Sequence, residues 1–448
     1  MKKNKVDIIT LGCAKNLVDS EQLLIQFQAN GYTVAHDPER VNGEIVVVNT
    51  CGFIGDAQEE SIQVILELEE AKKKGRIGKL FVMGCLSERF MKDLQLEITG
   101  VDRYYGKFNW KNLLNDLGKA YHDELAHDRV LTTPAHYAYL KIAEGCNRTC
   151  SFCVIPTITG KYKSRPMDEI VDEARLLVAR GVKELQVVAQ DLTYYGMDLY
   201  KEATLPELVE RLSDIRGLAW IRLHYGYPAH FPLDLLRVMR ERPNVCKYLD
   251  IALQHISDRM LEKMRRRITS RETYELLHQI RQEVPGIHLR TTLMVGHPGE
   301  TDDDFAALIA FVKKMRFERL GAFAYSHETG TYASLNYEDE VPEVVKKQRL
   351  DTLMRVQKTI VKAENAKKVG KIFQTIIDRK EGGFYIGRTA FDSPEVDPEV
   401  LIISDKRLRI GAFYDVRIEK IDAYDLVGKV VFFSNKNIFL QKVDKIFG

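Results

Sequence analysis

The sequence predicts a multidomain α/β protein in three parts. An N-terminal Rossmann-like parallel α/β domain is expected over residues 1–125, a larger TIM-like β/α barrel over 132–362, and a small antiparallel, OB-like β-barrel over 365–433. Three observations predict this division. The 448 residues exceed the usual size of one compact domain. Strand and helix patterns then alternate over most of the chain, and short strands separated by turn residues follow them.

The N-terminal part alternates short apolar runs with helical segments. The runs VDIITLG, EIVVVNT and KLFVMG are typical of buried strands, and helices are expected from about residue 20 to 30 and from about 57 to 74. This is the rhythm of βαβ units, which build a parallel sheet covered by helices. The prediction of a Rossmann-like first domain depends on this alternation of strands and helices.

The middle part contains six further apolar runs separated by helical patterns. They are YAYLKIAEG, ELQVVAQ, WIRLHYG, YLDIALQ, HLRTTLMVG and RLGAFAYS. So many repeats favour an open or closed β/α barrel over a small doubly wound sheet. A helical stripe over 341–368 is expected to pack on this barrel, and the turn-rich strands beyond residue 369 predict the last domain.

Composition excludes some classes of protein. With 45% hydrophobic and 29% charged residues, the chain is typical of globular proteins, and no membrane association is expected. The basic start MKKNK is not followed by a signal-length apolar segment, which indicates a cytoplasmic protein. The net charge of +2 gives no broad basic surface for nucleic acid, so any RNA contact must be local. Seven cysteines in such a chain favour metal ligands or catalytic thiols over disulfides.

Three cysteines are clustered in GCNRTCSFC, directly after the first strand of the predicted barrel. Active sites of β/α barrels gather at that end of the strands. The thiolates of Cys146, Cys150 and Cys153 can bind three irons of a 4Fe–4S cluster and leave the fourth iron open for chemistry. A zinc site or a cluster for plain electron transfer remains the alternative, but either would need a fourth ligand that no local residue supplies.

Three further cysteines each follow a different predicted strand of the first domain. Cys13 comes after VDIITLG, Cys51 after EIVVVNT and Cys85 after KLFVMG. The carboxyl ends of parallel strands meet at one edge of a sheet, where ligands bind. A second cluster with an open iron is therefore expected there. The alternative is three unrelated buried thiols, which would not explain their common position. Cys246 matches neither set and is expected to be a packing residue.

The spacing C-x3-C-x2-C, with Phe152 before the last cysteine, resembles the signature of the radical S-adenosylmethionine superfamily. The resemblance implies that S-adenosylmethionine chelates the open iron and is cleaved reductively to a 5′-deoxyadenosyl radical. It also implies cofactor contacts at barrel strand ends, although Arg222 could equally be a structural ion-pair residue. The residues expected to contact the cofactor are Phe152, Gln190, Asp191, Arg222, Gln254, Gly296, Pro298 and Glu300.

Both cysteine sets together, over residues 5–428, resemble the methylthiotransferases. In that family an N-terminal auxiliary cluster accompanies the radical cluster, and a C-terminal TRAM domain holds the substrate. The resemblance implies two 4Fe–4S clusters and S-adenosylmethionine, which convert a C–H bond to C–SCH3. It also implies an electron donor such as flavodoxin or ferredoxin, and it leaves the sulfur donor open. No catalytic acid or base is assignable, because His255 and His297 are expected to serve hydrogen bonding or packing.

Three segments bear on the substrate. LGCAKNLVDSE, SFCVIP and GRTAFDSPEVD resemble the methylthiotransferases that modify the β-carbon of an aspartate in ribosomal protein S-twelve of the small subunit. A transfer-RNA adenosine methylthiotransferase is the rival, and a non-catalytic iron–sulfur ribosome-assembly or RNA-binding factor is a more distant alternative. Thr159 departs from the family, which usually has arginine there.

An acidic group in the last domain points to the same substrate. Four acids in and on either side of the SPEVD stretch are expected to suit a basic ribosomal protein better than RNA. The alternative is that they form a solvated turn. These acids are Asp392, Glu395, Asp397 and Glu399.

Overall fold

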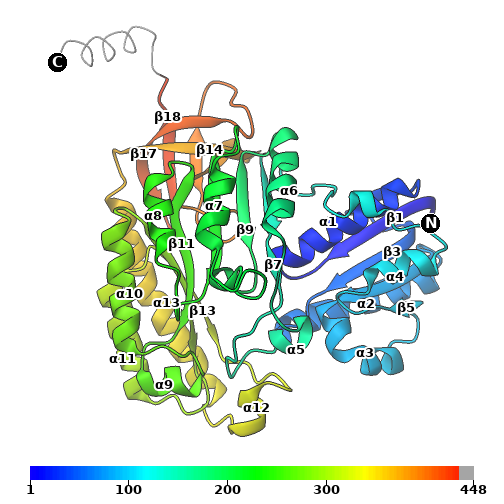
Figure 1. Ribbon diagram of the computed structural model, residues 1–448, viewed down its shortest axis with the longest axis horizontal. Coiled ribbons are helices and arrows are strands. Elements are labelled where there is room, and N and C mark those ends of the chain that lie inside the picture. The colour runs from blue at the N-terminus through cyan, green and yellow to red at the C-terminus, as the bar shows by residue number, and fades with distance from the viewer. Residues whose placement is uncertain (433–448) are drawn as a thin grey trace.

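The computed structural model of the protein describes residues 1–432, so the predicted last residue of the third domain, 433, lies outside the described residues. Figure 1 shows the N-terminal α/β unit beside a central sheet covered by helices, with a small β-barrel at one end of that sheet. In the part of the chain that is described, no helix combines the length and the apolar character needed to cross a membrane.

The N-terminal unit is a five-stranded parallel sheet in the order β2-β1-β3-β4-β5. This is one of the two common orders of doubly wound sheets. Its strands are β1 (Lys2–Thr10), β2 (Thr33–His36), β3 (Gly43–Thr50), β4 (Lys79–Gly84) and β5 (Arg103–Tyr104). Its helices are α1 (Ala14–Ala29), α2 (Gly55–Lys73), α3 (Cys85–Glu97) and α4 (Trp110–Asp116).

Alternating residues of the strands fill two cores. Ile8 and Val47 pack toward α1 and α4 on one face, whereas Val48 and Val82 pack toward α2 and α3 on the other. Strands that are buried on both faces are nearly continuous apolar runs, which is why the sequence pattern identified them. The short 3-10 helix η1 (Asp123–Leu125) lies in the connection to the central unit.

The central unit is an open, six-stranded parallel sheet in the order β13-β12-β11-β10-β9-β6, so the predicted barrel is of the open kind. Its strands are β6 (Tyr137–Lys141), β9 (Glu184–Val188), β10 (Trp220–Gly226), β11 (Val245–Gln254), β12 (His288–Val295) and β13 (Arg319–Ala324). Its helices are α5 (Ile155–Thr159), α6 (Met167–Ala179), η2 (Leu192–Tyr194), α7 (Leu205–Ser213), α8 (Asp234–Glu241), α9 (Asp258–Lys263), α10 (Ser270–Glu283), α11 (Asp302–Met315), α12 (Tyr332–Asn336) and α13 (Glu343–Ala366).

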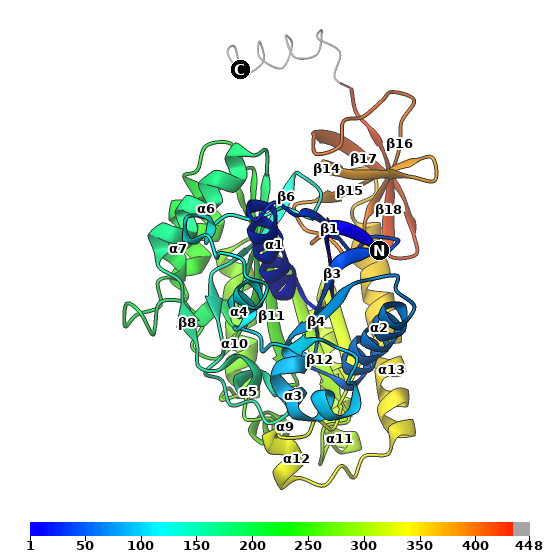
Figure 2. The same cartoon turned by 90° about the vertical axis from the view of Figure 1, so that its right-hand side faces the viewer.

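Longer helices cover the outer face of this sheet (Figures 1 and 2) and bury one large apolar core. The predicted helix over 341–368 is α13, whose Leu353 and Ile360 belong to that core. A small antiparallel ribbon of β7 (Ala143–Glu144) and β8 (Lys163–Ser164) brackets the clustered cysteines.

The C-terminal unit is a closed five-stranded barrel in the order β14-β15-β16-β18-β17. Its strands are β14 (Ile372–Glu381), β15 (Phe384–Thr389), β16 (Val400–Ile403), β17 (Phe413–Asp422) and β18 (Asp425–Val430). The prediction of an antiparallel barrel needs one correction, because β16 and β18 pair in parallel. A closed ring with an odd number of strands cannot alternate direction throughout, so at least one parallel pair is unavoidable.

Two of the four acids predicted to form a surface of this unit, Asp392 and Asp397, have buried carboxylates, and for these two that interpretation was wrong. Residues 389–399, here called the plug segment, enter the amino end of the central sheet. Asp392 pairs there with Arg319 of β13, and the Tyr248 hydroxyl of β11 donates to Asp397 Oδ2 at 2.7 Å. Both carboxylates are nearly inaccessible. They serve the packing of two domains, so neither contact with a ribosomal protein nor a solvated turn describes them.

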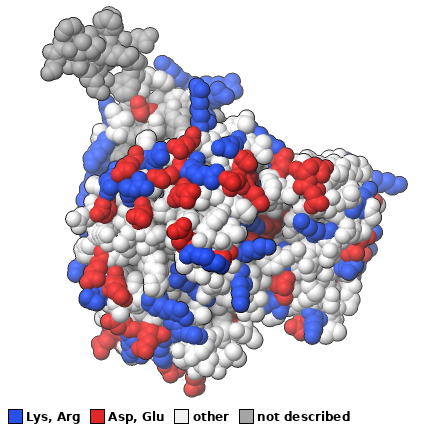
Figure 3. Space-filling view, viewed as in Figure 1, with Lys and Arg blue, Asp and Glu red and all other residues white. Residues whose placement is uncertain are grey.

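The other two acids of the group are also engaged within the chain. Glu395 accepts hydrogen bonds at 3.0 Å from the hydroxyls of Tyr137 and Tyr139 on β6. Glu399 forms a bidentate ion pair with Arg379 of β14. On the face seen in Figure 3, basic and acidic side chains are interspersed, and no extended field of one sign covers it.

Arg222 lies in the same interface, not at the cofactor end of the sheet. Its Nε donates to Glu184 Oε1 at 3.0 Å, and its Nη1 donates to the carbonyl of Ala390 in the plug segment at 2.8 Å. Arg388 of the small barrel binds the other oxygen of Glu184 at 2.8 Å. Arg222 therefore takes the structural ion-pair role, and the expectation that it contacts the cofactor is corrected. Cys246 packs there beside Trp220, as predicted.

Candidate active site

The first three cysteines converge at the carboxyl edge of the N-terminal sheet. Thr50 is in register with Gly84, so Cys51 and Cys85 leave neighbouring strands at the same level. Cys13 lies near them, because a Cβ added to Gly12 would come within 2.9 Å of Cys51 Sγ. The Asn16 side chain donates to the carbonyl of Thr50 at 3.1 Å and ties this loop to β3. Cys13 and Cys51 thus flank the point where strand order reverses, the usual ligand crevice of such sheets.

Two of these thiols stand at helix starts, which the sequence pattern did not reveal. The helix expected from about residue 20 begins at Ala14, with Cys13 as its N-cap, and α3 begins at Cys85. Desolvation opposes ionisation of Cys13, but the ammonium groups of Lys15 and Lys107 outweigh it and lower its pKa. Burial raises the pKa of Cys85 to about 12. A bound cation would be needed to hold Cys85 as a thiolate at neutral pH.

The second cysteine set occupies the loop after β6 and β7. The backbone N–H of Ser151 donates to the carbonyl of Met264 at 3.0 Å, and the Ser151 hydroxyl contacts His297 Nε2 at 2.9 Å. Arg266 donates to Cys150 Sγ at 3.0 Å. Burial, followed by the nearby Cys150, raises the pKa of Cys153 well above its usual range. Hydrogen bonds with Met264, His297 and Arg266 hold the loop, and a bound cation would be needed to keep Cys153 as a thiolate at neutral pH.

The two sets lie next to each other across a domain interface. Cys85 of the first set packs with Val154, which directly follows Cys153 of the second, in one apolar cluster with Phe53 and Ile158. A second tie lies farther out. Glu328, after β13, accepts from Arg89 Nη1 at 2.9 Å and from the backbone N–H of Gly55 at 2.9 Å.

A buried ionic network fills the rest of this interface. Asp19 of α1 binds both Lys107, at 2.9 Å, and Lys141 of β6. Lys141 also pairs with Glu144 at 2.7 Å, two residues before Cys146. Burial opposes the charge of Glu144, but the ammonium groups of Lys141 and Lys107 outweigh it and lower its pKa to about 2. The network fixes the spacing between the two cysteine edges.

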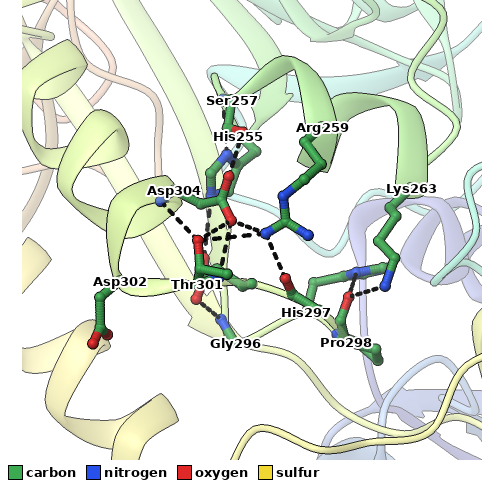
Figure 4. Close-up of polar contacts among 12 residues, drawn as sticks. His255, Ser257, Arg259, Lys263, Gly296, His297, Pro298, Thr301, Asp302 and Asp304 are labelled. Carbon is green, nitrogen blue, oxygen red and sulfur yellow. Dashed lines mark hydrogen bonds and ion pairs between the residues drawn. The ribbon is translucent and has the colours of Figure 1, made fainter.

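The turn Gly296–Glu300 was expected to approach the cofactor through its glycine. Figure 4 shows this turn between α9 and the start of α11. Gly296 has a φ of 73°, and a Cβ there would lie 2.3 Å from Cγ of Lys346 on α13. Its lack of a side chain therefore makes room for a lysine of this chain. Glu300 accepts from the Gly296 N–H at 2.7 Å and from Arg349 at 2.6 Å, so this carboxylate closes the turn.

The two histidines of this region have the structural roles expected of them. His255 contacts Glu300 Oε1 at 3.1 Å, while His297 lies between Ser151 and the carbonyl of Pro298. Burial lowers the pKa of His297 to about 4, so its ring is neutral at physiological pH. His297 therefore links the turn to the cysteine loop as a neutral hydrogen-bonding group.

The remaining expected cofactor contacts differ in how fully they are paired. Asp191 is occupied, because its carboxylate accepts from Arg148 at 2.7 Å and from Thr193. Gln190 donates to Glu144 at 3.1 Å, but among residues 1–432 its buried Oε1 has no hydrogen-bond donor. The same holds for the buried Oε1 of Gln254, which sits at the end of β11 with a φ of 71°. These two buried oxygens are free to accept hydrogen bonds from a polar ligand at the carboxyl end of the sheet.

Phe152 completes the wall of this region. Its ring packs beside Met260, Met294 and Tyr325 and meets the His297 ring edge to face at 6.4 Å between centroids. An apolar wall beside unpaired polar atoms is the usual makeup of a small-molecule site.

The donor chemistry of both sites fits iron–sulfur clusters. Each offers three thiols at strand ends, and within residues 1–432 no three His, Cys, Asp or Glu side chains are arranged as ligands of one metal ion. In a 4Fe–4S cluster every thiolate binds a different iron, so its ligands stand farther apart than those of a single ion. The three thiols of each site are of the donor type that such a cluster takes.

The comparisons with known proteins decide the family. Residues 140–312 match the Radical SAM superfamily, residues 369–431 the TRAM domain, and residues 5–106 an uncharacterized protein family, UPF0004. The ribosomal protein uS12 methylthiotransferase RimO of Parabacteroides distasonis is 72% identical over 96% of this chain and all of its own length. This chain belongs to the RimO family. It is therefore a radical SAM methylthiotransferase, and the predicted resemblance is confirmed.

Other relatives extend the same result. RimO of Phocaeicola vulgatus is 64% identical over 96% of this chain and 100% of its own, and RimO of Christiangramia forsetii is 51% identical over 96% and 95%. Among solved structures, the radical S-adenosylmethionine methyltransferase TsrM of Kitasatospora setae matches with a TM-score of 0.53 at 16% identity, covering 72% of this chain and 75% of that one. This last likeness supports the fold only. Membership in the radical SAM superfamily implies a 4Fe–4S cluster and S-adenosylmethionine as cofactors of RimO proteins.

Sequence reasoning missed the charged residues that surround the two cysteine sets. Lys107 and Lys141 come from different domains, and Arg266 lies 116 residues beyond the cysteine that it contacts. No local pattern brings such residues together. Lys15 could have been predicted from the sequence, because it comes two residues after Cys13 in GCAKN.

Proposed function

We propose that this enzyme methylthiolates the β-carbon of an aspartate in ribosomal protein uS12 and uses two 4Fe–4S clusters to do so. The radical cluster would be held by Cys146, Cys150 and Cys153. The auxiliary cluster would be held by Cys13, Cys51 and Cys85. The observation that carries the proposal is the contact between Cys85 and Val154, because it puts two three-thiol sites side by side. The names of the relatives support the substrate.

The described residues can perform three tasks in this reaction. The unpaired oxygens of Gln190 and Gln254 can accept hydrogen bonds from the amino group of S-adenosylmethionine, and Phe152 with Pro298 can flank the cofactor. When bound, the radical cluster and S-adenosylmethionine supply the radical that removes a hydrogen atom from carbon. Burial excludes water from Cys150 and Cys85, which protects reactive species from side reactions.

The first set of thiols, Cys13, Cys51 and Cys85, has a separate task. Three thiols at one sheet edge leave one iron of a cluster without a protein ligand, and a sulfur donor can bind there. The close packing of the two edges restricts the substrate carbon to the space between them. The positive charges of Arg266 and Lys107 favour the ionised, metal-binding forms of Cys153 and Cys85, respectively.

The test of the substrate is mass spectrometry of uS12 from cells that lack this gene. We expect uS12 to lose the mass of one methylthio group, and a plasmid copy of the gene to restore it. Unchanged uS12 together with transfer RNA lacking a methylthio group on adenosine would support the rival substrate. Unchanged uS12 and unchanged transfer RNA would contradict both substrates.

Three smaller expectations accompany the proposal. The enzyme would act in the cytoplasm, where ribosomes are assembled, and would receive electrons from a flavodoxin or a ferredoxin. We keep the division into domains at 1–125, 132–362 and 365–433. Limited proteolysis with mass analysis of the fragments tests that division, because cleavage is expected in the connecting segments first.

A further inference from the structure

Lys15 carries a charge that the described part of the protein leaves without a partner. It lies in the first turn of α1, two residues after Cys13, and is 9% exposed. Its Nζ sits 4.1 Å from the centroid of the Tyr225 ring. Within residues 1–432 this ammonium has neither an ion-pair nor a hydrogen-bond partner. A buried ammonium with a cation–π contact alone recovers only part of its lost hydration.

The surrounding charges do not compensate for it. Three carboxylates lie in and beside this interface, and each is paired with another cation: Asp19 with Lys107 at 2.9 Å, Glu144 with Lys141 at 2.7 Å, and Asp250 with Arg290 at 3.7 Å. These three acids and three bases together are neutral. Lys15 therefore adds one positive charge beside the cysteine edge.

The position of Lys15 points to the substrate. Tyr225 ends β10 at the carboxyl edge of the central sheet, and its backbone has the unusual φ of 63°. That conformation costs free energy in a tyrosine, and it presents the ring, which is 37% exposed, beneath Lys15. The ammonium therefore lies between the edge that bears Cys13 and the strand ends of the radical site, where the substrate carbon must stand.

We propose that Lys15 binds the carboxylate of the target aspartate and selects an acidic side chain for modification. The inference rests on the proposed function. The β-carbon is two bonds from the carboxylate oxygens, so an ion pair between these oxygens and Lys15 would hold the reacting C–H bond in a defined position. Asparagine has the same shape but no charge, and it would lose the charge-assisted hydrogen bond.

The test compares binding of two substrates to the reconstituted enzyme that contains its clusters. The substrates are uS12 and uS12 whose target aspartate is replaced by asparagine, and the dissociation constants are measured by calorimetry with S-adenosylmethionine present. For the unmodified enzyme we expect about tenfold to hundredfold tighter binding of the aspartate form. For Lys15→Met, which keeps the length of the side chain without its charge, we expect equal binding of both forms. Lys15→Arg should retain the preference.

The controls separate this role from two others. Lys74→Met removes an exposed lysine at the end of α2 and should keep the full preference. Iron content and the electron paramagnetic resonance spectrum of the Lys15 variants show whether the clusters remain. If Lys15→Met keeps the preference for aspartate, the inference is wrong. If Lys15→Met keeps the preference for aspartate and also alters the cluster spectrum, the charge of Lys15 serves to balance the negative charge of the auxiliary cluster.

Failure of the proposed function would look different. The unmodified enzyme would then bind neither form of uS12 measurably and would leave uS12 unmodified, while still cleaving S-adenosylmethionine. That outcome overturns the substrate assignment and the inference with it.

Discussion

The two ends of the central sheet carry different kinds of buried polar side chain and use them for different purposes. At the amino end, Arg222, Glu184 and Asp392 pair with one another or with their neighbours and join the small barrel to the sheet. At the carboxyl end, the oxygens of Gln190 and Gln254 have no partner among the described residues, and thiols gather beside them. Buried charges that form ion pairs within the chain, as at Glu184, join two domains, whereas the unpaired amide oxygens beside the thiols are candidates for ligand contact.

The largest effect is expected at the carboxyl end. Cys153→Ala should remove one ligand of the radical cluster, lower the iron content from roughly eight to roughly four per chain, and abolish 5′-deoxyadenosine formation. Cys13→Ala should cost a similar amount of iron but leave 5′-deoxyadenosine formation in place, because it touches only the first set. Iron analysis and chromatography of the reaction check both. Cys246→Ala serves as the matched control, since Cys246 packs in the other interface.

At the amino end we expect a loss of stability instead of activity. Arg388→Met leaves the buried carboxylates of Glu184 and Asp378 without their shared cation, at a cost of about 3 to 5 kcal/mol. The fluorescence of Trp220 reports the change, because its ring packs against Phe413 of the small barrel with 4.8 Å between the ring centroids. Urea unfolding followed by its fluorescence, in a Trp110→Phe background, measures the free energy.

Arg379→Met is the control for that variant. Arg379 also binds carboxylates, but it is 47% exposed, so its loss should cost less than about 1 kcal/mol. Equal losses for the two arginines would show that the ion pairs under the plug segment do not hold the interface.

Asp392 makes the same interface sensitive to acid. Burial opposes its charge, but the cations of Arg319 and Lys368 outweigh it and hold its pKa below the ordinary 3.8. A carboxyl with a lowered pKa contributes stability above its ordinary pKa and loses that contribution as the pH falls through its folded value. We expect the Trp220 transition to shift to lower urea below about pH 4.

Asp392→Asn should remove most of this acid sensitivity and cost about 2 kcal/mol at neutral pH. The shift is measured between pH 6 and 3 with both proteins. An Asp392→Asn variant that keeps the full pH dependence would assign the acid sensitivity to other carboxylates.

The smallest effect concerns one unpaired oxygen at the carboxyl end. Gln254→Ala should weaken binding of S-adenosylmethionine about threefold to tenfold, the value of one hydrogen bond. Gln279→Ala on the exposed side of α10 is the control and should bind normally. Equal affinities in a titration of the two variants would remove Gln254 from the cofactor site.

Much of the fold was predictable because buried parallel strands leave nearly continuous apolar runs such as EIVVVNT. The cysteine sites followed from the same pattern, since Cys13, Cys51 and Cys85 each come after one of these runs. The role of Arg222 and of the plug segment was not predictable, because it depends on Glu184 and Arg319, which are distant in sequence. The start of α1 was missed because Lys15 and Asn16 interrupt the apolar periodicity that marks a helix.

The central claim is that the two cysteine sets form separate sites with separate tasks. The most direct measurement is one reaction of the reconstituted enzyme with uS12, in which 5′-deoxyadenosine and methylthiolated uS12 are quantified together. For a variant with alanine at Cys13, Cys51 and Cys85, we predict continued 5′-deoxyadenosine formation and no methylthiolated uS12. Methylthiolation at the unmodified rate in that variant would contradict the account.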